Sequence, residues 1–167
     1  MPVVLGSVRP DRRSLLPARL IVERVAEAGH QTELVDLRAL DLPLYGQDES
    51  DEQLPAVLDF KATMARADAV IWLTPEYNHG YTSATKSAID YLHAELRRKP
   101  VAVCGLSTGP IGGARAVEQL KLVLIEMHAL PIRDSVYFSA ARSLFDPEVK
   151  VVSYPVTVED GQVYISM

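Results

Sequence analysis

The 167-residue sequence lacks the features that mark secreted, membrane-spanning or nucleic-acid-binding proteins. Cys104 is the only cysteine, so no disulfide can form within the chain, and this favours a cytoplasmic location. No segment reaches the ~18 apolar residues needed to span a membrane, and no charged and apolar leader opens the chain. The formal net charge of −5 argues against nucleic acid as a partner, because clustered positive charge binds phosphate backbones.

The histidines and the cysteine do not have the pattern of a metal site or a nucleophile. His30, His79, His93 and His128 show no two-ligand spacing with a cysteine or with a second histidine. Cys104 lies among valine and alanine, where a small buried apolar filler is the more frequent role. We therefore expect no metal ion, and we assign no catalytic residue.

Length and a hydrophobic content of 48% predict one domain with a full core. Apolar runs predict strands over residues 3–5, 32–37, 69–73, 101–106 and 132–138, and helical spacing predicts helices over 15–28, 54–66, 83–96 and 113–128. The acidic run at 48–52 is typical of a solvated loop before a helix. Alternating strands and helices predict an α/β fold, a doubly wound five-stranded parallel sheet of order 2-1-3-4-5 with helices on both faces.

The last residues have a different pattern. Residues 139–167 follow the fifth predicted strand as an extension whose structure the pattern leaves open, and we expect them to belong to the same domain. Within them, residues 151–165 alternate between apolar and polar around Asp160-Gly161. Alternation around Asp-Gly is a hairpin signal.

The most informative motif is Thr74-Pro75-Glu76-Tyr77-Asn78-His79-Gly80, which directly follows the apolar run at 69–73. Ligands of open α/β sheets bind beyond the carboxyl ends of the strands. A polar loop with an aromatic ring and an amide at that place, rigid at Pro75 and free to turn at Gly80, suits a planar, hydrogen-bonding ligand. The alternative is an ordinary strand-to-helix loop, since proline, asparagine and glycine are common there for backbone reasons.

The loop after the first strand, residues 6–14, has the composition of an anion site. It precedes a helix, whose first N–H groups and dipole favour negative charge. Ser7 and Ser14 add hydroxyl donors, and Arg9 with Arg12 or Arg13 can meet a phosphate in a fork. Alternatively, Ser14 caps the helix and the arginines are solvated. The spacing is that of neither a P-loop nor Gly-x-Gly-x-x-Gly, so a phosphomonoester fits better than ATP or a dinucleotide.

A third loop, residues 107–113, joins the fourth predicted strand to the next helix. Three glycines in five positions allow close approach of backbone to a ligand, whereas simple turning needs only one or two. With three such loops on strand-to-helix junctions, we expect one composite site at one end of the sheet.

These motifs together resemble those of the NADPH-dependent FMN reductase family, whose fold is flavodoxin-like. The residues that carry the resemblance are Gly6-Ser7-x-Arg9, Thr74 to Gly80 with Lys86-Ser87-Ala88-Ile89-Asp90, and Gly112-Gly113-x-Arg115-Ala116. The resemblance covers roughly residues 3–138, so it implies that residues 1–138 form a flavodoxin-like FMN-binding domain. It also implies a homodimer or homotetramer, for which we expect Tyr81 and Tyr91 near the subunit boundary.

The resemblance implies an FMN site with two parts. The phosphate would meet Ser7, Arg9 and the backbone around Ser14, Leu15 and Leu16. The flavin ring would lie between Pro75, Glu76, Tyr77, Asn78, His79 and Gly80 on one loop and Ser107, Gly109, Gly112 and Gly113 on another. NADPH or NADH would donate hydride, and the acceptor would be a small molecule: a free flavin, a quinone, an azo dye or a metal ion.

The sequence departs from the family pattern in several places, one of which is the first strand, since it starts almost at residue 1 and is unusually short. Thr85 and Ser87 stand on either side of Lys86 where the family usually has leucine and asparagine, a change that bears on packing or subunit contact more than on flavin binding. The family's closing helix is hard to find after Phe138. Two other functions remain open: an FMN-binding electron carrier without its own NAD(P)H activity, and a ligand-free regulator or scaffold of the same fold.

Overall fold

The fold is built on a five-stranded, all-parallel sheet of order β2-β1-β3-β4-β5, as predicted. A computed structural model describes residues 1–144, 156–159 and 162–165. The strands are β1 (Pro2–Leu5), β2 (Glu33–Asp36), β3 (Val70–Pro75), β4 (Pro100–Leu106) and β5 (Leu130–Phe138). The helices are α1 (Leu15–Glu27), α2 (Leu37–Leu40), α3 (Pro55–Arg66), α4 (Ser83–Asp90) and α5 (Ala114–Glu126).

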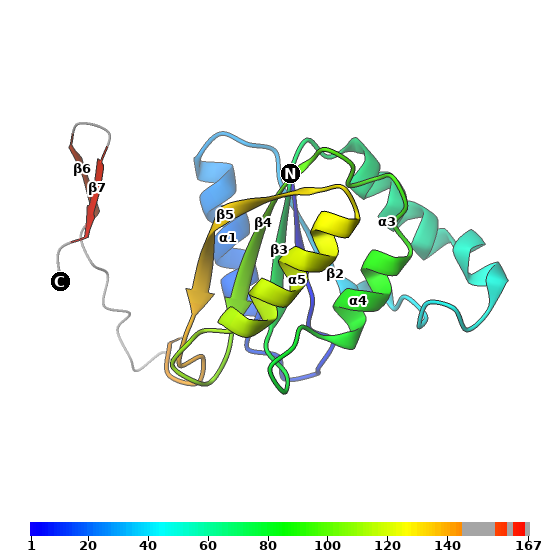
Figure 1. Ribbon diagram of the computed structural model, residues 1–167, viewed down its shortest axis with the longest axis horizontal. Helices are drawn as coiled ribbons and strands as arrows, with labels where there is room; N and C mark the ends of the chain where they lie inside the picture. Colours follow the sequence, from blue (N-terminus) through cyan, green and yellow to red (C-terminus); the bar gives the residue numbers. More distant parts are fainter. Residues whose placement is uncertain (145–155, 160–161, 166–167) are drawn as a thin grey trace.

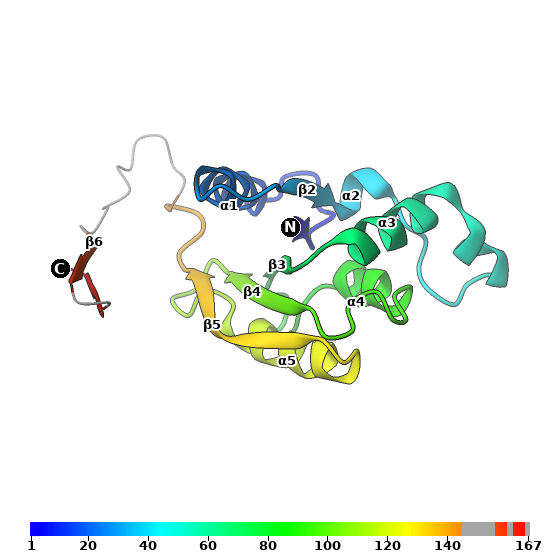
Figure 2. The ribbon, with the colours of Figure 1, turned by 90° about the horizontal axis from the view of Figure 1, so that it is seen from above.

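Helices lie on both faces of the sheet (Figures 1 and 2). The larger core joins Val4, Trp72 and Val103 of the sheet to side chains of α3, α4 and α5. The smaller core joins Leu5 and Leu73 to α1. The central strands are apolar on both faces because both are covered, as is usual for parallel sheets.

Two short helices replace what the sequence predicts as irregular chain. α2 is a single turn that begins after Asp36, whose side chain accepts a hydrogen bond from the Arg38 N–H at 3.1 Å. A 3-10 helix, η1 (Glu49–Gln53), occupies the acidic run and begins at Asp48, which accepts from the Ser50 N–H and hydroxyl. These bonds lower the pKa of Asp48 below its usual value. Both helices begin at a side-chain cap. They are too short for the spacing of apolar residues to predict them.

The predicted helix over 83–96 is wrong in its second half, because α4 ends at Asp90. Leu92 and Leu96 have helical spacing and both are buried, but the chain that carries them forms turns instead of a helix. The Glu95 side chain accepts from the His93 N–H at 2.6 Å and from the Ala94 N–H at 3.0 Å. A side chain that bonds nearby backbone N–H groups in this way competes with the helix.

Polar side chains fasten the first turns of α4 to neighbouring loops. Thr82 caps α4 by accepting from the Thr85 N–H at 3.0 Å, and its hydroxyl donates to the Gly6 carbonyl at 2.5 Å. The Ser87 hydroxyl accepts from the Tyr45 N–H at 2.8 Å and donates to the Pro43 carbonyl at 3.1 Å. Since Thr85 and Ser87 are buried, these two departures from the family pattern serve packing within the chain.

The predicted C-terminal hairpin is confirmed in its strands. β6 (Val156–Glu159) and β7 (Gln162–Ile165) pair antiparallel. The expected turn at 160–161 lies outside the described residues. That residues 139–167 belong to the same domain stays a prediction.

The glycines between β4 and α5 are required by the backbone. Gly112 and Gly113 have φ angles of 59° and 88°, in the left-handed region. A Cβ on Gly112 would lie 2.7 Å from the Cβ of Tyr137 and 2.9 Å from its carbonyl carbon. A Cβ on Gly113 would lie 2.7 Å from the Leu106 nitrogen. The turn therefore packs directly on β4 and β5, which accounts for both glycines without a ligand.

We expect Gly112→Ala to lower the free energy of unfolding by about 2–4 kcal/mol, because it adds left-handed strain to a clash with the β5 backbone. Gly29→Ala is the matched control: its φ is 85°, but nothing lies within 4 Å of the added Cβ. That change is expected to cost only about 1 kcal/mol. Urea unfolding of the two variants measures the difference, and equal losses would contradict the packing role of Gly112.

Candidate functional site

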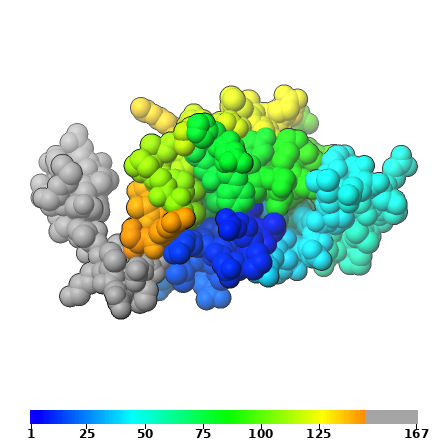
Figure 3. Space-filling model, turned by 90° about the horizontal axis from the view of Figure 1, so that it is seen from below, coloured from blue at the N-terminus to red at the C-terminus, as the bar shows by residue number. Residues whose placement is uncertain are grey.

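A cleft of about 460 Å³ opens at the carboxyl ends of the strands. Four loops contribute its lining: Ser7, Arg9, Asp11, Arg12, Arg13 and Ser14 after β1, Pro75, Glu76 and Tyr77 at the end of β3, Leu106 and Thr108 at the end of β4, and Ala141 and Arg142 after β5. Figure 3 views this edge of the molecule, where the dark blue residues after β1 lie between green and orange segments. Four arginines and two acidic residues face the cleft in a chain of net charge −5, so positive charge is concentrated here.

The loop after β1 offers polar groups that have no partner. Arg12 forms an ion pair with Asp36, and only 8% of its side chain is exposed. Its Nε and Nη1 atoms are buried without a hydrogen-bond partner among the described residues, and so is the Ser14 hydroxyl. Buried donors are almost always satisfied in proteins. Unpaired donors that line an open cleft therefore indicate a ligand with several acceptor oxygens.

Ser14 does not act as a helix cap. It stands at the N-cap position of α1 with φ −72° and ψ −11°, and its side chain makes no capping hydrogen bond. Only its carbonyl serves the helix, by accepting from the Ala18 N–H at 3.1 Å. The capping alternative considered for this serine is therefore wrong, and its hydroxyl is left for another partner.

The loop after β3 forms a tight two-residue turn. Tyr77 and Gly80 exchange backbone hydrogen bonds of 2.9 and 3.0 Å, while Asn78 and His79 take φ angles of 50° and 71°. The prediction that Gly80 supplies the turning freedom is wrong, because the left-handed positions are Asn78 and His79. Asparagine tolerates this region better than most residues. The amides of Glu76 and Tyr77 are already paired, that of Glu76 with the Leu106 carbonyl at 2.8 Å.

A cation braces this turn from α5. Arg115 Nε donates to Glu76 Oε1 at 2.8 Å, and Arg115 Nη1 lies 2.7 Å from His79 Nε2. A guanidinium only donates, so His79 accepts through Nε2 and carries its ring proton on Nδ1. Gln119 also donates to the His79 carbonyl at 2.8 Å. At the other end of the motif, the hydroxyls of Tyr77 and Ser7 lie 3.1 Å apart and join the first two loops.

The structure brings only part of the predicted site into the cleft. Ser7, Arg9, Ser14, Pro75, Glu76 and Tyr77 line it. The other predicted residues lie around it: Leu15 and Leu16 on the first turn of α1, Asn78, His79 and Gly80 in the tight turn, and Ser107, Gly109, Gly112 and Gly113 before α5. Sequence reasoning missed the lining residues after β5, Ala141 and Arg142. They could have been predicted, because the residues that follow a fifth parallel strand lie at the same edge of the sheet as the other loops.

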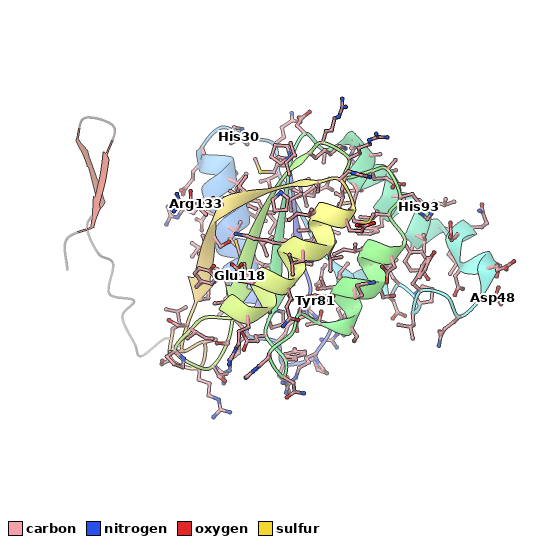
Figure 4. All side chains as sticks on the ribbon, in the orientation of Figure 1. His30, Asp48, Tyr81, His93, Glu118 and Arg133 are labelled. Atoms are coloured by element: carbon pink, nitrogen blue, oxygen red, sulfur yellow. The ribbon has the colours of Figure 1, made fainter. Side chains whose placement is uncertain are left out.

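Other chemistries have little support in the described part of the chain. No group of three histidine, cysteine or acidic side chains there is placed to hold a metal ion. Figure 4 labels His30 and His93, which lie at different parts of the molecule.

Cys104 is buried, and burial raises the pKa of its thiol to about 11, so it is not a reactive thiolate near neutral pH. None of the described helices combines the length and the hydropathy of a membrane span.

The doubly wound sheet, with a cleft lined by arginines at its carboxyl edge, defines a flavodoxin-like α/β protein. The chain belongs to the NADPH-dependent FMN reductase family, whose family model matches residues 2–143. It is thus an oxidoreductase of the predicted class, which works with FMN and a reduced nicotinamide cofactor, and the electron-carrier alternative is not favoured.

Relatives and solved structures support this assignment. A quinone reductase of Pseudomonas putida is 34% identical over 157 residues, which cover 89% of this chain and 82% of that protein. An NADPH azoreductase of Bacillus sp. (strain OY1-2) is 34% identical over 128 residues, which cover 76% of this chain and 69% of that protein. Among solved structures, FerB, a flavoenzyme NAD(P)H:(acceptor) oxidoreductase of Paracoccus denitrificans, has 32% identity and a TM-score of 0.66, over 80% of this chain and 76% of that one.

We expect Ser14→Ala to change the unfolding free energy of the ligand-free protein by less than about 0.5 kcal/mol, because the hydroxyl makes no cap. Thr82→Ala is the comparison, since Thr82 caps α4 and bonds the Gly6 carbonyl. Its loss is expected to cost about 1–3 kcal/mol. Urea unfolding measures both. A loss at Ser14 as large as that at Thr82 would make the Ser14 hydroxyl a structural group.

Proposed function

We propose that the protein transfers a hydride from NADPH or NADH to FMN held in this cleft, and passes the electrons to a small-molecule acceptor such as a quinone, a free flavin, an azo compound or a metal ion. The observation that carries the proposal is a set of buried donors without a partner, Nε and Nη1 of Arg12 and the Ser14 hydroxyl, beside the exposed Arg9. These residues fit a phosphomonoester. FMN, when bound, supplies the hydride-accepting chemistry.

The first loop binds the phosphate in this proposal. Asp36 holds the Arg12 guanidinium in place, so its free N–H groups are oriented before any ligand arrives. Ser7 and Ser14 add hydroxyls, the backbone at Leu15 and Leu16 adds the first N–H groups of α1, and Arg9 closes over the phosphate from solvent. Charge-assisted hydrogen bonds of this kind are roughly twice as strong as neutral ones.

The two later loops position the flavin ring. Pro75, Tyr77 and Leu106 provide apolar and aromatic surface in the cleft. The N–H groups of Asn78 and His79, at the tip of the tight turn, are the donors that this loop offers to the ring, since the amides of Glu76 and Tyr77 are already paired. Backbone N–H groups of the turn from Gly109 to Gly113 would stabilise negative charge on the reduced ring, as oxyanion donors do, whereas the Ser107 N–H is already paired with the Phe138 carbonyl at 3.1 Å.

No residue is assigned as a general acid or base. Hydride transfer requires that the donor and acceptor atoms be held roughly 3–3.5 Å apart, which is a task of placement. Arg115 contributes indirectly, because it fixes Glu76 and His79 and thereby the shape of the turn. It acts as a positioning residue.

We further propose a cytoplasmic homodimer or homotetramer. In support, Val8 and Leu44 are exposed and border a hollow beside α2 and α4, and exposed apolar residues of this kind are typical of subunit contacts. Tyr81 is half-buried next to α4 (Figure 4). The ring of Tyr91 is buried inside the protomer against the exposed Tyr45, so any contribution of Tyr91 to a subunit contact would be indirect.

Replacing Arg9 with alanine is expected to weaken FMN binding by about 1.5–3 kcal/mol, the range for charged hydrogen bonds. Calorimetry with FMN measures the loss. Riboflavin lacks the phosphate, so its affinity should be lower than that of FMN and should not respond to Arg9→Ala. Arg19→Ala, an exposed arginine on α1, is the control and should leave FMN affinity unchanged. Unchanged FMN affinity with a less stable ligand-free protein would instead make Arg9 structural.

Turnover tests the enzyme assignment. Mixed anaerobically with the FMN-loaded protein, NADPH or NADH should bleach the flavin absorbance, and a quinone should restore it, with ping-pong kinetics from one shared site. We propose that the Asn78 side-chain amide orients the ring; Asn78→Gly keeps the left-handed turn and the backbone N–H but removes this amide, so it should slow the reduction without loss of stability. If neither nicotinamide reduces the flavin while a chemical reductant does, the protein is an electron carrier.

A further inference from the structure

One face of the sheet is covered over only part of its width. α1 packs against β1 and β2, whereas α5 packs on the opposite face against β3, β4 and β5. Figure 2 shows these two helices on opposite sides of the sheet. Within residues 1–144, α1 reaches β4 only at its carboxyl end, where Cys104 and Leu106 share its core, and no helix is packed along β5 on the α1 side.

The surface left bare by α1 is apolar. Val136 is paired in register with Cys104, and Cys104 belongs to the small core on the α1 side. Val136 therefore lies on that face, where 52% of its surface is exposed. Ile71 and Ala102, which pair in the neighbouring strands on the same face, are only half-buried. Apolar side chains of three adjacent strands thus meet solvent at one place.

β5 is also the edge of the sheet. It is nine residues long, and Leu130 and Ile132 are exposed on it in addition to Val136. Natural proteins protect long apolar edge strands with charges, bulges or a covering segment, because bare ones promote aggregation. β5 has some of these protections, namely a register shift opposite Val101–Val103 and the residues Pro131, Arg133 and Asp134, yet Val136 beyond them pairs regularly and remains exposed.

The hairpin has an apolar face of its own. In its register, Val156 pairs with Ile165 and Val158 with Val163. The pairs between them are Thr157 with Tyr164 and Glu159 with Gln162. Paired residues share a face and successive residues alternate between faces. The register therefore places four positions with β-branched apolar residues, 156, 158, 163 and 165, on one face of the hairpin. A lone two-stranded hairpin is marginally stable in water, so this face needs a surface to pack on.

The chain leaves the domain beside the bare face. Ala141 is buried in the small core on the α1 side, and the Arg142 carbonyl accepts from Arg13 at 3.2 Å. The structure describes the hairpin and the domain but not residues 145–155 between them. Eleven residues reach at most about 36–40 Å when extended. β5, with nine residues, is about 30 Å long, so the chain is long enough to bring the hairpin back along it.

We propose that the hairpin β6–β7 packs the face that carries positions 156, 158, 163 and 165 onto the exposed α1-side face of β5 in the same chain, over Val136 and the half-buried Ala102 of β4. A hairpin with strands of four residues is small enough to lie on this uncovered part of the sheet, and facing sheets pack about 10 Å apart. The same chain is the occupant because a short connection gives its own hairpin an effective concentration near the millimolar range. A hairpin from a second copy is the competing occupant.

Paired cysteines test this contact. Val136→Cys is combined with Val163→Cys, and the product is treated with a bismaleimide that spans about 10 Å, the spacing of packed sheets. The control pair is Val136→Cys with Tyr164→Cys, which lies one residue further on the opposite face of the hairpin. Cys104 is 4% exposed and does not compete. Mass spectrometry of the intact chain and of its peptides should show at least about tenfold more internal cross-link in the Val163 pair.

Two results would overturn the proposal. Equal yields from the two pairs would mean that the hairpin does not dock by this face, and a cross-linked dimer would make a second copy the occupant. Hydrogen exchange of β5 in the full chain gives an independent measurement. Val163→Asp should speed exchange of the β5 amides by about tenfold, whereas Tyr164→Asp should not. No change with Val163→Asp would count against the contact.

Discussion

Parallel pairing of β1, β3 and β4 is the constraint on which the rest of the molecule depends. Val3, Val4 and Leu5 of β1 and Trp72 and Leu73 of β3 are fully buried, so these strands are held by burial on both faces. Because every strand of the sheet runs in one direction, all carboxyl ends meet at one edge, and the loops after β1, β3, β4 and β5 share a cleft. The site is a consequence of strand direction before any functional side chain is considered.

The electrostatics of that edge are opposite to those of the whole chain. Four arginines face the cleft although the net charge is −5. Asp36 is central to this arrangement, since its carboxylate pairs with the nearly buried Arg12 and also accepts from the first turn of α2. The ion pair lets a guanidinium be buried and keep two nitrogens unpaired, which costs stability in the ligand-free protein and suits a phosphate. The family relationship and the cleft therefore agree on the same ligand chemistry.

Much of the fold and part of the site were predictable. Apolar runs located all five strands of the main sheet, and the motifs at Gly6–Arg9 and Thr74–Gly80 indicated the loops that form the cleft. The errors have local physical causes. The helical spacing of Leu92 and Leu96 predicted a helix where Glu95 instead stabilises turns. Gly80 was predicted to allow the turn, but the residues with left-handed backbone are Asn78 and His79. At Gly112, packing against Tyr137 requires glycine whether or not a ligand is bound.

The sequence by itself determined the order of strands and helices, the single buried cysteine and the positions of the three loops, because these depend on periodicity and composition along the chain. The tertiary structure alone decided that Arg12 pairs with Asp36, that Arg115 braces Glu76 and His79, and that Ala141 and Arg142 complete the cleft. Each of these contacts joins residues more than twenty positions apart or from different loops. The local sequence pattern does not show which distant residues come into contact, since these contacts are set by how the helices and strands pack.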